Sequence, residues 1–153
     1  MTDTEKQKNL SVTDAVESDL EDILSIENRC FSFPHTREQL ERELSDENCV
    51  ILCVHRDGMV AGYVTMQTVL DEGYIGNVAV RENFRRNGIA DELIHALKRR
   101  AEQRGLAFLT LEVRDSNEPA KALYVKNGFN FVGKQKNYYT QPKEDAIIMT
   151  LMF

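Results

Sequence analysis

The spacing of apolar residues changes several times along the chain, and each change predicts a different element. Between residues 20 and 30 the spacing is that of an amphipathic helix. The positions that share one face of this helix are Leu20, Ile23, Leu24 and Glu27. Ser18–Glu21 and Thr36–Gln39 both have capping-box spacing, so a second, short helix is expected after the break at Phe33-Pro34.

Strands are predicted where apolar residues run together or alternate between turn residues. The predicted strands are residues 9–13, 49–55, 60–70, 74–80, 108–113, 131–138 and 146–153. Asp57-Gly58 is a hairpin signal between the second and third of these strands. Residues 71–73 predict another turn, and a polar loop that contains Pro142 is expected between the last two strands.

Two later helices decide the fold class. One is expected from Asp91 to about Arg104, with Gly105 as its left-handed cap, and the other carries Pro119 in its first turn and stops at Asn127. A strand, a helix and a strand in succession predict a parallel pair, whereas the hairpins predict antiparallel pairs. The pattern therefore predicts an α/β fold with a mixed central sheet flanked by helices.

Length and charge narrow the function classes. The chain has 153 residues, which predicts one domain at residues 10–153 after a flexible extension at residues 1–9. The formal net charge of −6 argues against nucleic-acid binding and is compatible with a cationic substrate. Neither a membrane span nor a signal peptide is predicted, because no long apolar run is present and the first residues are polar.

Cysteine usage points to a reduced compartment. The three residues Cys30, Cys49 and Cys53 form an odd set without a secretory signal, so we expect a cytoplasmic protein with free thiols. Cys49 and Cys53 are too far apart in one strand to pair, about 13 Å at the rise of a strand. No cysteine and histidine spacing resembles a zinc site, so no metal is expected.

The stretch Arg85–Ala90 is the first candidate for chemistry. It lies between a predicted strand and a predicted helix, where the first N–H groups of the helix have no internal partner and can bind a phosphate. The six residues of this candidate anion site are Arg85, Arg86, Asn87, Gly88, Ile89 and Ala90. The alternative is a turn in which glycine serves only the backbone, since neither a Walker loop nor a dinucleotide fingerprint is present.

Glu112 and Tyr124 are the second and third candidates. Glu112 interrupts an apolar strand, and a desolvated carboxylate there would act as a base. Its alternatives are an exposed strand position or a pair with Arg114. Tyr124, on the following helix, is either a proton donor to a leaving group or a core residue.

Two blocks of sequence resemble the GNAT family of N-acetyltransferases. Arg85-x-x-Gly88-x-Ala90 resembles the pyrophosphate-binding signature of that family, and residues 113–129, with Asn117, Tyr124 and Gly128-Phe129, resemble its second signature. Four further segments are similar to the bacterial ribosomal-protein alanine N-acetyltransferases, a branch of the family. These segments are residues 77–80, 111–114, 137–139 and 144–149.

The resemblance implies acetyl-CoA as cosubstrate and direct transfer in a ternary complex. It implies Glu112 as general base, Tyr124 as general acid, and main-chain groups at Val78, Ala79 and Val80 that bind the pantetheine arm. Asn117 matches a position that contacts this arm. The peptide groove would be flanked by Phe33, His35, Tyr138 and Tyr139, although the two tyrosines can also be read as surface residues. His35 and Ala90 depart from the pattern, where tryptophan and glycine are frequent.

Three functions are therefore carried forward. The first is acetylation of the N-terminal amine, with alanine expected, of a basic small-subunit ribosomal protein by a monomer or weak dimer. The second is a GNAT enzyme for a small-molecule amine. The third is a non-catalytic regulator that binds acyl-CoA. The resemblance covers the chain from about Leu10 to Phe153.

Overall fold

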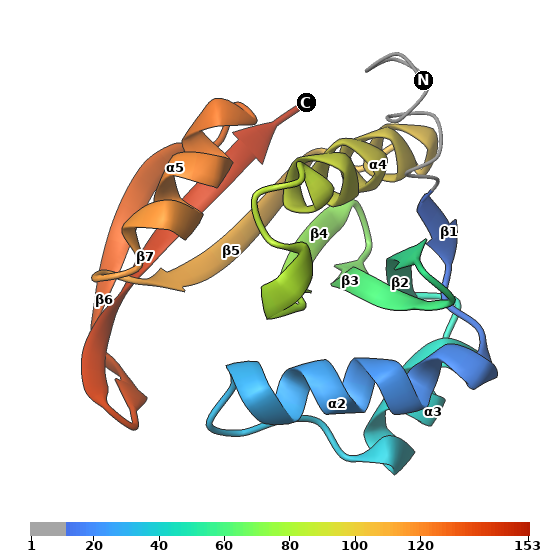
Figure 1. The fold of residues 1–153 in the computed structure, drawn as a ribbon. Coiled ribbons are helices and arrows are strands. Elements are labelled where there is room, and N and C mark those ends of the chain that lie inside the picture. Colours follow the sequence, from blue (N-terminus) through green and yellow to red (C-terminus); the bar gives the residue numbers. More distant parts are fainter. Residues whose placement is uncertain (1–11) are drawn as a thin grey trace.

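The computed structural model describes residues 12–153, which form a twisted sheet with helices on both faces (Figure 1). The strands are β1 (Val12–Asp14), β2 (Cys49–Arg56), β3 (Met59–Val69), β4 (Glu72–Val80), β5 (Phe108–Arg114), β6 (Asn130–Thr140) and β7 (Lys143–Met152). The helices are α2 (Leu20–Cys30), α3 (Arg37–Ser45), α4 (Ile89–Gln103) and α5 (Glu118–Lys126). The predicted α/β class is confirmed, while the extension at 1–9 and the start of the strand predicted at 9–13 lie outside the described residues.

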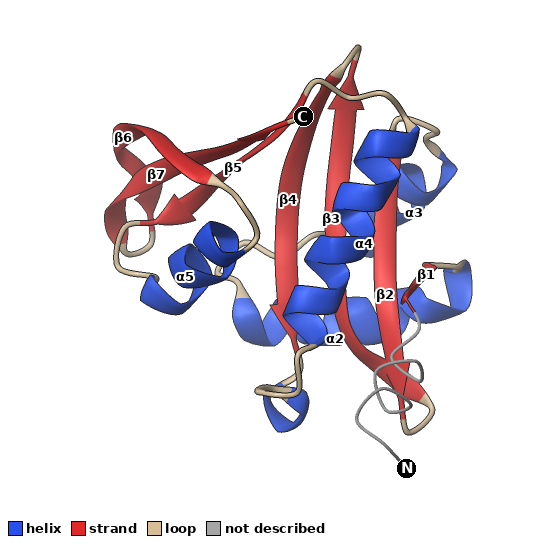
Figure 2. Cartoon of the chain, turned by 90° about the horizontal axis from the view of Figure 1, so that it is seen from above, coloured by secondary structure: helices blue, strands red, loops and turns tan. Residues whose placement is uncertain are grey.

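The strands are ordered β1-β2-β3-β4-β5-β7-β6, and β4 and β5 are the parallel neighbours. This parallel pairing is short, because it joins only Glu72–Tyr74 to Phe108–Thr110. Beyond that point the two strands separate, as Figure 2 shows. The sheet is therefore open at the carboxyl ends of its two parallel strands, where ligands bind in open α/β sheets.

Two apolar clusters fix the helices against the sheet. On one face α4 contributes Leu93, Ile94 and Leu97, and on the other α2 contributes Leu20 and Ile23, all fully buried. Figure 1 shows α4 above the sheet and α2 with α3 below it. None of the helices at residues 12–153 has the length and apolar character that a membrane crossing requires.

The two predicted helix caps have different outcomes. Thr36 and Gln39 form the predicted reciprocal bonds, at 3.2 Å and 2.8 Å. The capping box predicted at Ser18–Glu21 is wrong, because a 3₁₀ turn precedes α2 and the Asp19 carboxylate accepts the Val16 N–H at 2.9 Å. Asp19 thus closes the 3₁₀ turn onto Val16, and no side chain caps the start of α2.

Two predicted turns are displaced in the structure. The turn predicted at residues 71–73 lies at Leu70 and Asp71, because Glu72 already pairs with Val69 as the first residue of β4. The last hairpin is longer than predicted, with β6 and β7 joined across Gln141-Pro142 instead of a long loop. Polar residues can continue a strand there because β6 is an edge strand whose side chains are largely exposed.

Candidate active site

A cavity of about 360 Å³ lies where β4 and β5 separate. Its walls come from the carboxyl halves of both strands, from the segment after α2 and from α5. Six of the predicted site residues line it: Phe33, Val78, Glu112, Asn117, Tyr124 and Tyr139. Residues that are widely separated in the sequence, and that were singled out for different reasons, therefore meet in one place.

Glu112 lies in this cavity on the exposed face of β5. The strand alternates, with Leu111 and Val113 buried and Glu112 exposed between them. The expected burial of Glu112 is therefore wrong, because the strand is covered on one face only. The alternative pairing with Arg114 is also wrong: among the described residues Arg114 pairs with Glu144, at 3.3 Å, and Glu112 forms no ion pair.

Arg114 holds the end of the last hairpin over the cavity. Its Nη1 donates to the Pro142 carbonyl at 2.8 Å and its Nη2 donates to the Gln141 carbonyl at 2.9 Å. The guanidinium also lies 4.2 Å from the centre of the Tyr139 ring. Ser32 donates to the same Gln141 carbonyl at 3.1 Å. These contacts connect the segment after α2 with the β6–β7 turn at the edge of the cavity.

The two tyrosines of the hairpin lie differently. Tyr139 is a cavity residue, and burial, with smaller effects of Tyr138 and Glu112, raises its pKa to about 12. Tyr138 packs edge-on against it, with ring centres 5.0 Å apart, but is 45% exposed and does not line the cavity. The structure thus places one tyrosine in the wall and the other on the outside of it.

Tyr124 is a core residue, and it also lines the cavity. Its ring is part of the main apolar cluster and packs edge-on against Phe129 at 5.6 Å, yet the residue also lines the cavity. Burial, followed by the nearby Tyr139, raises the pKa of Tyr124 to about 12. The phenol therefore stays protonated at neutral pH and can donate a proton into the cavity.

Asn117 caps α5 from the cavity wall. Its side-chain oxygen accepts the Ala120 N–H at 3.2 Å, which satisfies one of the orphan donors at the start of that helix. The amide nitrogen of the same side chain is a donor that the cap leaves unused. Asn117 can therefore hold α5 in place and still offer a donor to a ligand.

The predicted anion site adopts the expected strand-turn-helix geometry. Gly88 is the N-cap of α4 in a left-handed conformation, with φ of 75°, and Arg86 before it has φ of 65°. A Cβ placed on Gly88 would meet nothing within 4 Å, so its φ explains the glycine and the space beside it is open. Asn87 stabilises the turn through bonds to the Phe84 and Arg85 carbonyls, at 3.0 and 3.2 Å.

The start of α4 is arranged so that its N–H groups face open space. No side chain caps this end of the helix. The Asp91 carboxylate, which would repel an anion, is held away by Lys126 at 3.0 Å and Asn127 at 3.2 Å. The side chains of Ala79 and Ile89 are buried in the two cores, so these residues can contact a ligand mainly through the backbone.

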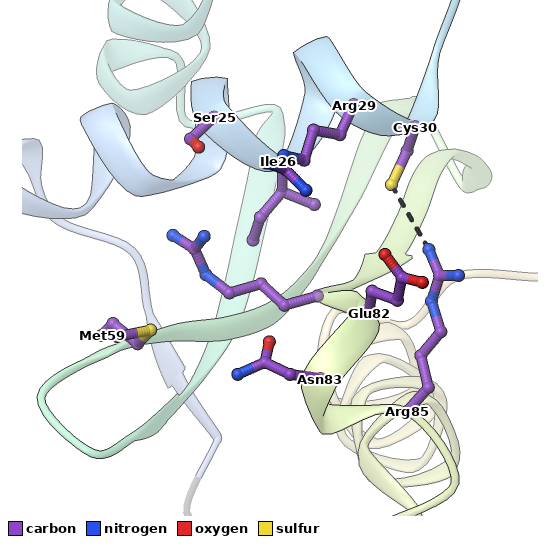
Figure 3. A pocket seen from close by; sticks show the side chains of 9 residues that line it. Ser25, Ile26, Arg29, Cys30, Met59, Glu82, Asn83 and Arg85 are labelled. Carbon is purple, nitrogen blue, oxygen red and sulfur yellow. Dashed lines mark hydrogen bonds between the residues drawn. The ribbon is translucent and has the colours of Figure 1, made fainter.

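Arg85 is turned away from the helix end. Its Nε donates to the Val80 carbonyl at 3.1 Å, and its Nη2 lies 3.8 Å from the Cys30 sulfur (Figure 3). Arg85 lines two cavities. One is a small cavity at the turn before α4, and the other is a wider cavity of about 830 Å³ between that turn and α2. Arg85 therefore fixes the turn to the end of α2, and it also occupies a Val80 main-chain group expected to meet the ligand.

His35, like Tyr138, lies outside the cavity wall. It faces inward, with Nδ1 at 2.8 Å from the carboxylate of Glu27, a residue fully buried in α2. The Glu27 carboxylate also accepts from the Asn77 side chain, and Asn77 lines the cavity. Neither Glu27 nor the Asn77 side chain was predicted as a site residue. A charged residue on the apolar face of the first helix was the available signal.

One cluster of possible metal ligands has no spacing in the sequence that resembles a zinc site. Asp19, Cys53 and His55 bring three possible metal-ligating atoms within 4.8 Å of one another. The Asp19 carboxylate already accepts from His55 at 2.7 Å and from the Cys53 thiol at 3.7 Å. Burial, with the nearby Asp19 charge, raises the pKa of Cys53 to about 12, so this thiol is a poor ligand. All three cysteines are free, as expected.

Comparison with known proteins establishes the class. Residues 20–129 match the model of the acetyltransferase (GNAT) family. This span contains the candidate anion site at residues 85–90, together with Glu112, Asn117 and Tyr124. The chain belongs to this family, and it is an acetyl-CoA-dependent N-acetyltransferase. The family resemblance that was inferred from the two signatures is thereby confirmed.

Similar individual proteins narrow the comparison within the family. The chain is 38% identical to ribosomal protein bS18-alanine N-acetyltransferase of Escherichia coli (strain K12) over 136 residues, which cover 88% of this chain and 91% of that protein. It is 32% identical to the Haemophilus influenzae protein of the same name, over 92% of this chain and 97% of the relative. The crystal structure of the Escherichia coli S18-alanine enzyme superposes with a TM-score of 0.84 at 35% identity, covering 93% and 92% of the two chains.

Proposed function

We propose that this enzyme acetylates the N-terminal amine of a small-subunit ribosomal protein, with alanine as the first residue. The observation that carries the proposal is the cavity between β4 and β5, which Glu112 and Tyr124 both line. The names of relatives at 32% and 38% identity support the same substrate.

The residues present fit acetyl-CoA as cosubstrate. The uncapped start of α4, with open space at Gly88, suits the pyrophosphate. Beyond Tyr74 the edge of β4 that faces β5 is not paired with that strand, so its main-chain groups suit the pantetheine arm as an added strand would. The unused amide of Asn117 suits the same arm.

Val78 is proposed as the main-chain donor at the reacting carbonyl. The Asn77 N–H points to β3, where it donates to Thr65 Oγ1 at 2.9 Å. Because successive N–H groups of a strand point to opposite edges, the Val78 N–H faces the open edge. A donor at this place would stabilise the negative charge that develops on the carbonyl oxygen during transfer.

Glu112 and Tyr124 supply the proton transfers in the proposed mechanism. Acetyl-CoA brings an activated acetyl group as a thioester. Glu112, directly or through water, removes a proton from the ammonium of the acceptor, whose pKa near 8 leaves it largely protonated at neutral pH. The new C–N bond forms as the C–S bond breaks, and Tyr124 donates a proton to the sulfur. The second proton that the acceptor nitrogen loses then restores the Tyr124 phenol. No covalent enzyme intermediate is needed.

The acceptor is expected to enter between the segment after α2 and the last hairpin. Phe33, which is 71% exposed, and Tyr139 both line the cavity there, and Tyr138 lies outside it. The exposed Glu112 and the chain's net charge of −6 favour a basic partner. A cytoplasmic, monomeric or weakly dimeric enzyme with residues 10–153 as its domain remains our prediction.

Two other functions are separated by a single experiment. A peptide mixture with N-terminal Ala, Ser, Met or a blocked end, some members with internal Lys, is incubated with free spermidine, acetyl-CoA and the enzyme, and analysed by mass spectrometry. Acetylation confined to the unblocked Ala peptide is the expected result. Acetylation of spermidine alone would assign a small-amine enzyme. Tight acetyl-CoA binding without transfer to any of these amines would mean that the acceptor is outside the mixture, because the family match argues against a non-catalytic regulator.

A further inference from the structure

Glu27 is a fully buried carboxylate for which the transfer chemistry has no use. It lies on the apolar face of α2, and its exposed fraction is 0%. Its neighbours on this helix, Leu20, Ile23 and Ile26, form the second apolar cluster. A buried charge in such a place is costly unless it is hydrogen-bonded, so the contacts of Glu27 indicate what it does.

Three donors from two other parts of the chain meet the Glu27 carboxylate. Oε1 accepts from the Asn77 side chain at 3.0 Å, from the His35 main-chain N–H at 3.2 Å and from His35 Nδ1 at 2.8 Å. Oε2 lies 3.2 Å from the same ring nitrogen. The carboxylate thus holds a strand and a loop, neither of which belongs to its own helix.

The strand is held at a bulge beside the reacting centre. Val64 is paired with Val78 and Met66 with Ile75, so Gly76 and Asn77 both lie opposite Thr65. Thr65 Oγ1 accepts the Asn77 N–H at 2.9 Å, and a Cβ on Gly76 would lie only 2.5 Å from this oxygen. The bulge is therefore closely packed on one side and is fixed through the Asn77 side chain by Glu27 on the other.

The loop that Glu27 holds forms the opposite wall. His35 follows Phe33 and Pro34, and residues 31–33 line the cavity. On its other side, the His35 ring has Nε2 at 3.6 Å from Glu43. Fixing both the main chain and the ring of His35 sets where Phe33 enters the cavity wall.

We propose that Glu27 is a positioning residue for acetyl transfer. It acts through Asn77 on strand β4, where acetyl-CoA is proposed to bind, and through His35 on the loop that carries Phe33. It sets the separation between the main chain at Val78 and the wall at Phe33. This inference rests on the proposed function. The distance between two reacting groups affects rates strongly, since a misplacement of about 1 Å can cost about 10²-fold.

The kinetic test uses Glu27→Gln, which keeps the shape of the side chain. The amide keeps one acceptor oxygen, but an NH2 group replaces Oε2, which lies 3.2 Å from His35 Nδ1. The loss of the negative charge also weakens the hydrogen bonds from Asn77 and His35. We expect kcat/KM for an Ala-initiated peptide to fall about 10- to 100-fold, with the KM for acetyl-CoA close to wild type because the turn before α4 is not touched. Asp19→Asn is the matched control: it alters a buried carboxylate at the other end of α2 and should change stability only.

A second readout is independent of activity. Amide hydrogen exchange in residues 31–36 and 74–80 should accelerate in Glu27→Gln but not in Asp19→Asn. Unchanged exchange, or unchanged peptide kinetics in an active enzyme, would overturn the proposal. If wild type acetylates no amine, the proposed function fails, while the exchange experiment still tests Glu27.

Two further variants, each of which removes one contact of Glu27, keep the test decisive if Glu27→Gln does not fold. Asn77→Ala cuts the strand contact and should lower kcat, whereas His35→Phe cuts the loop contact and should raise the peptide KM. The proposal of two separate roles would be refuted if Asn77→Ala raised the peptide KM and His35→Phe lowered kcat. It would also be refuted if both variants changed kcat and KM equally.

Discussion

The donor side and the acceptor side that we propose for the active site are built in different ways. The donor side comes from one nearly continuous stretch, in which β4, the turn at residues 85–88 and the start of α4 follow one another. The acceptor side is assembled from the segment after α2, from β5 and from the last hairpin, which are joined by contacts such as Ser32 to Gln141 and Arg114 to Pro142.

This difference teaches where sequence and structure each carry the information. A continuous site depends on local backbone geometry, so its residue types recur at fixed spacing. An assembled site depends on contacts between distant segments, which leave no fixed spacing. Variants of the two sides should therefore fail differently: donor variants in the binding of acetyl-CoA, and acceptor variants in the binding of the peptide.

The largest effects are expected at the centre, where the two sides meet. Glu112→Gln and Tyr124→Phe should each lower kcat about 10²- to 10⁴-fold, because each removes one proton transfer. Steady-state assays with an Ala peptide would measure the loss, and calorimetric titration with CoA would show binding unchanged. If both variants turn over like wild type, the assignment of these residues is wrong.

A variant of the donor side should weaken acetyl-CoA binding by about 10-fold. Gly88→Val places a β-branched residue at φ of 75°, where the strain is of order 1–3 kcal/mol and reshapes the anion turn. Gly105→Val is the matched control, since Gly105 has φ of 70° and open space at the other end of α4. Equal Kd values for CoA in the two variants would contradict a binding role for this turn.

A variant of the acceptor side should raise the peptide KM about fivefold. Arg114→Lys loses the paired donors to Gln141 and Pro142, worth about 1 kcal/mol, and loses the planar contact with Tyr139. Arg100→Lys is its control, because Arg100 pairs with Asp14 through two contacts of 2.9 and 2.8 Å outside the site. A rise in the KM for acetyl-CoA instead would place Arg114 on the donor side.

The smallest effect concerns stability in alkali. Burial raises the pKa of Tyr124 from 10.0 to about 12, so this tyrosine stabilises the fold fully below pH 10, and that stabilisation is lost as the pH rises toward 12. Urea midpoints measured from pH 9 to pH 12 should fall less steeply for Tyr124→Phe than for wild type. Parallel curves would show that Tyr124 ionises as freely in the folded chain as in the unfolded chain.

Much of the fold could be predicted because it follows from local rules. The hairpin at Asp57-Gly58, the Thr36 cap and the end of α4 before Gly105 each depend on a few adjacent residues, and all three are confirmed. The Ser18 cap was wrong because the chain enters α2 through a 3₁₀ turn, which Asp19 closes onto the Val16 N–H. Spacing rules indicate that a helix begins here but do not show that a short turn precedes it.

Six of the predicted site residues meet in one cavity, but the sequence did not show how each of them is buried or paired. Glu112 lies in the cavity, yet it is exposed, because the sequence could not show that β5 is covered on one face only. His35 was placed in the groove but is turned toward Glu27, a partner eight residues earlier in the chain. Which of two possible partners a charged side chain chooses is decided by tertiary packing.

The short pairing of β4 with β5 has a consequence for turnover. If the unpaired edge of β4 and the start of α4 bind the cosubstrate, they bind its pantetheine arm and pyrophosphate, which the reaction does not change. Spent CoA then keeps almost every contact and competes with fresh acetyl-CoA for the same opening in the sheet. We expect CoA to be a competitive inhibitor of comparable affinity, so the rate in the cell would follow the ratio of acetylated to free CoA.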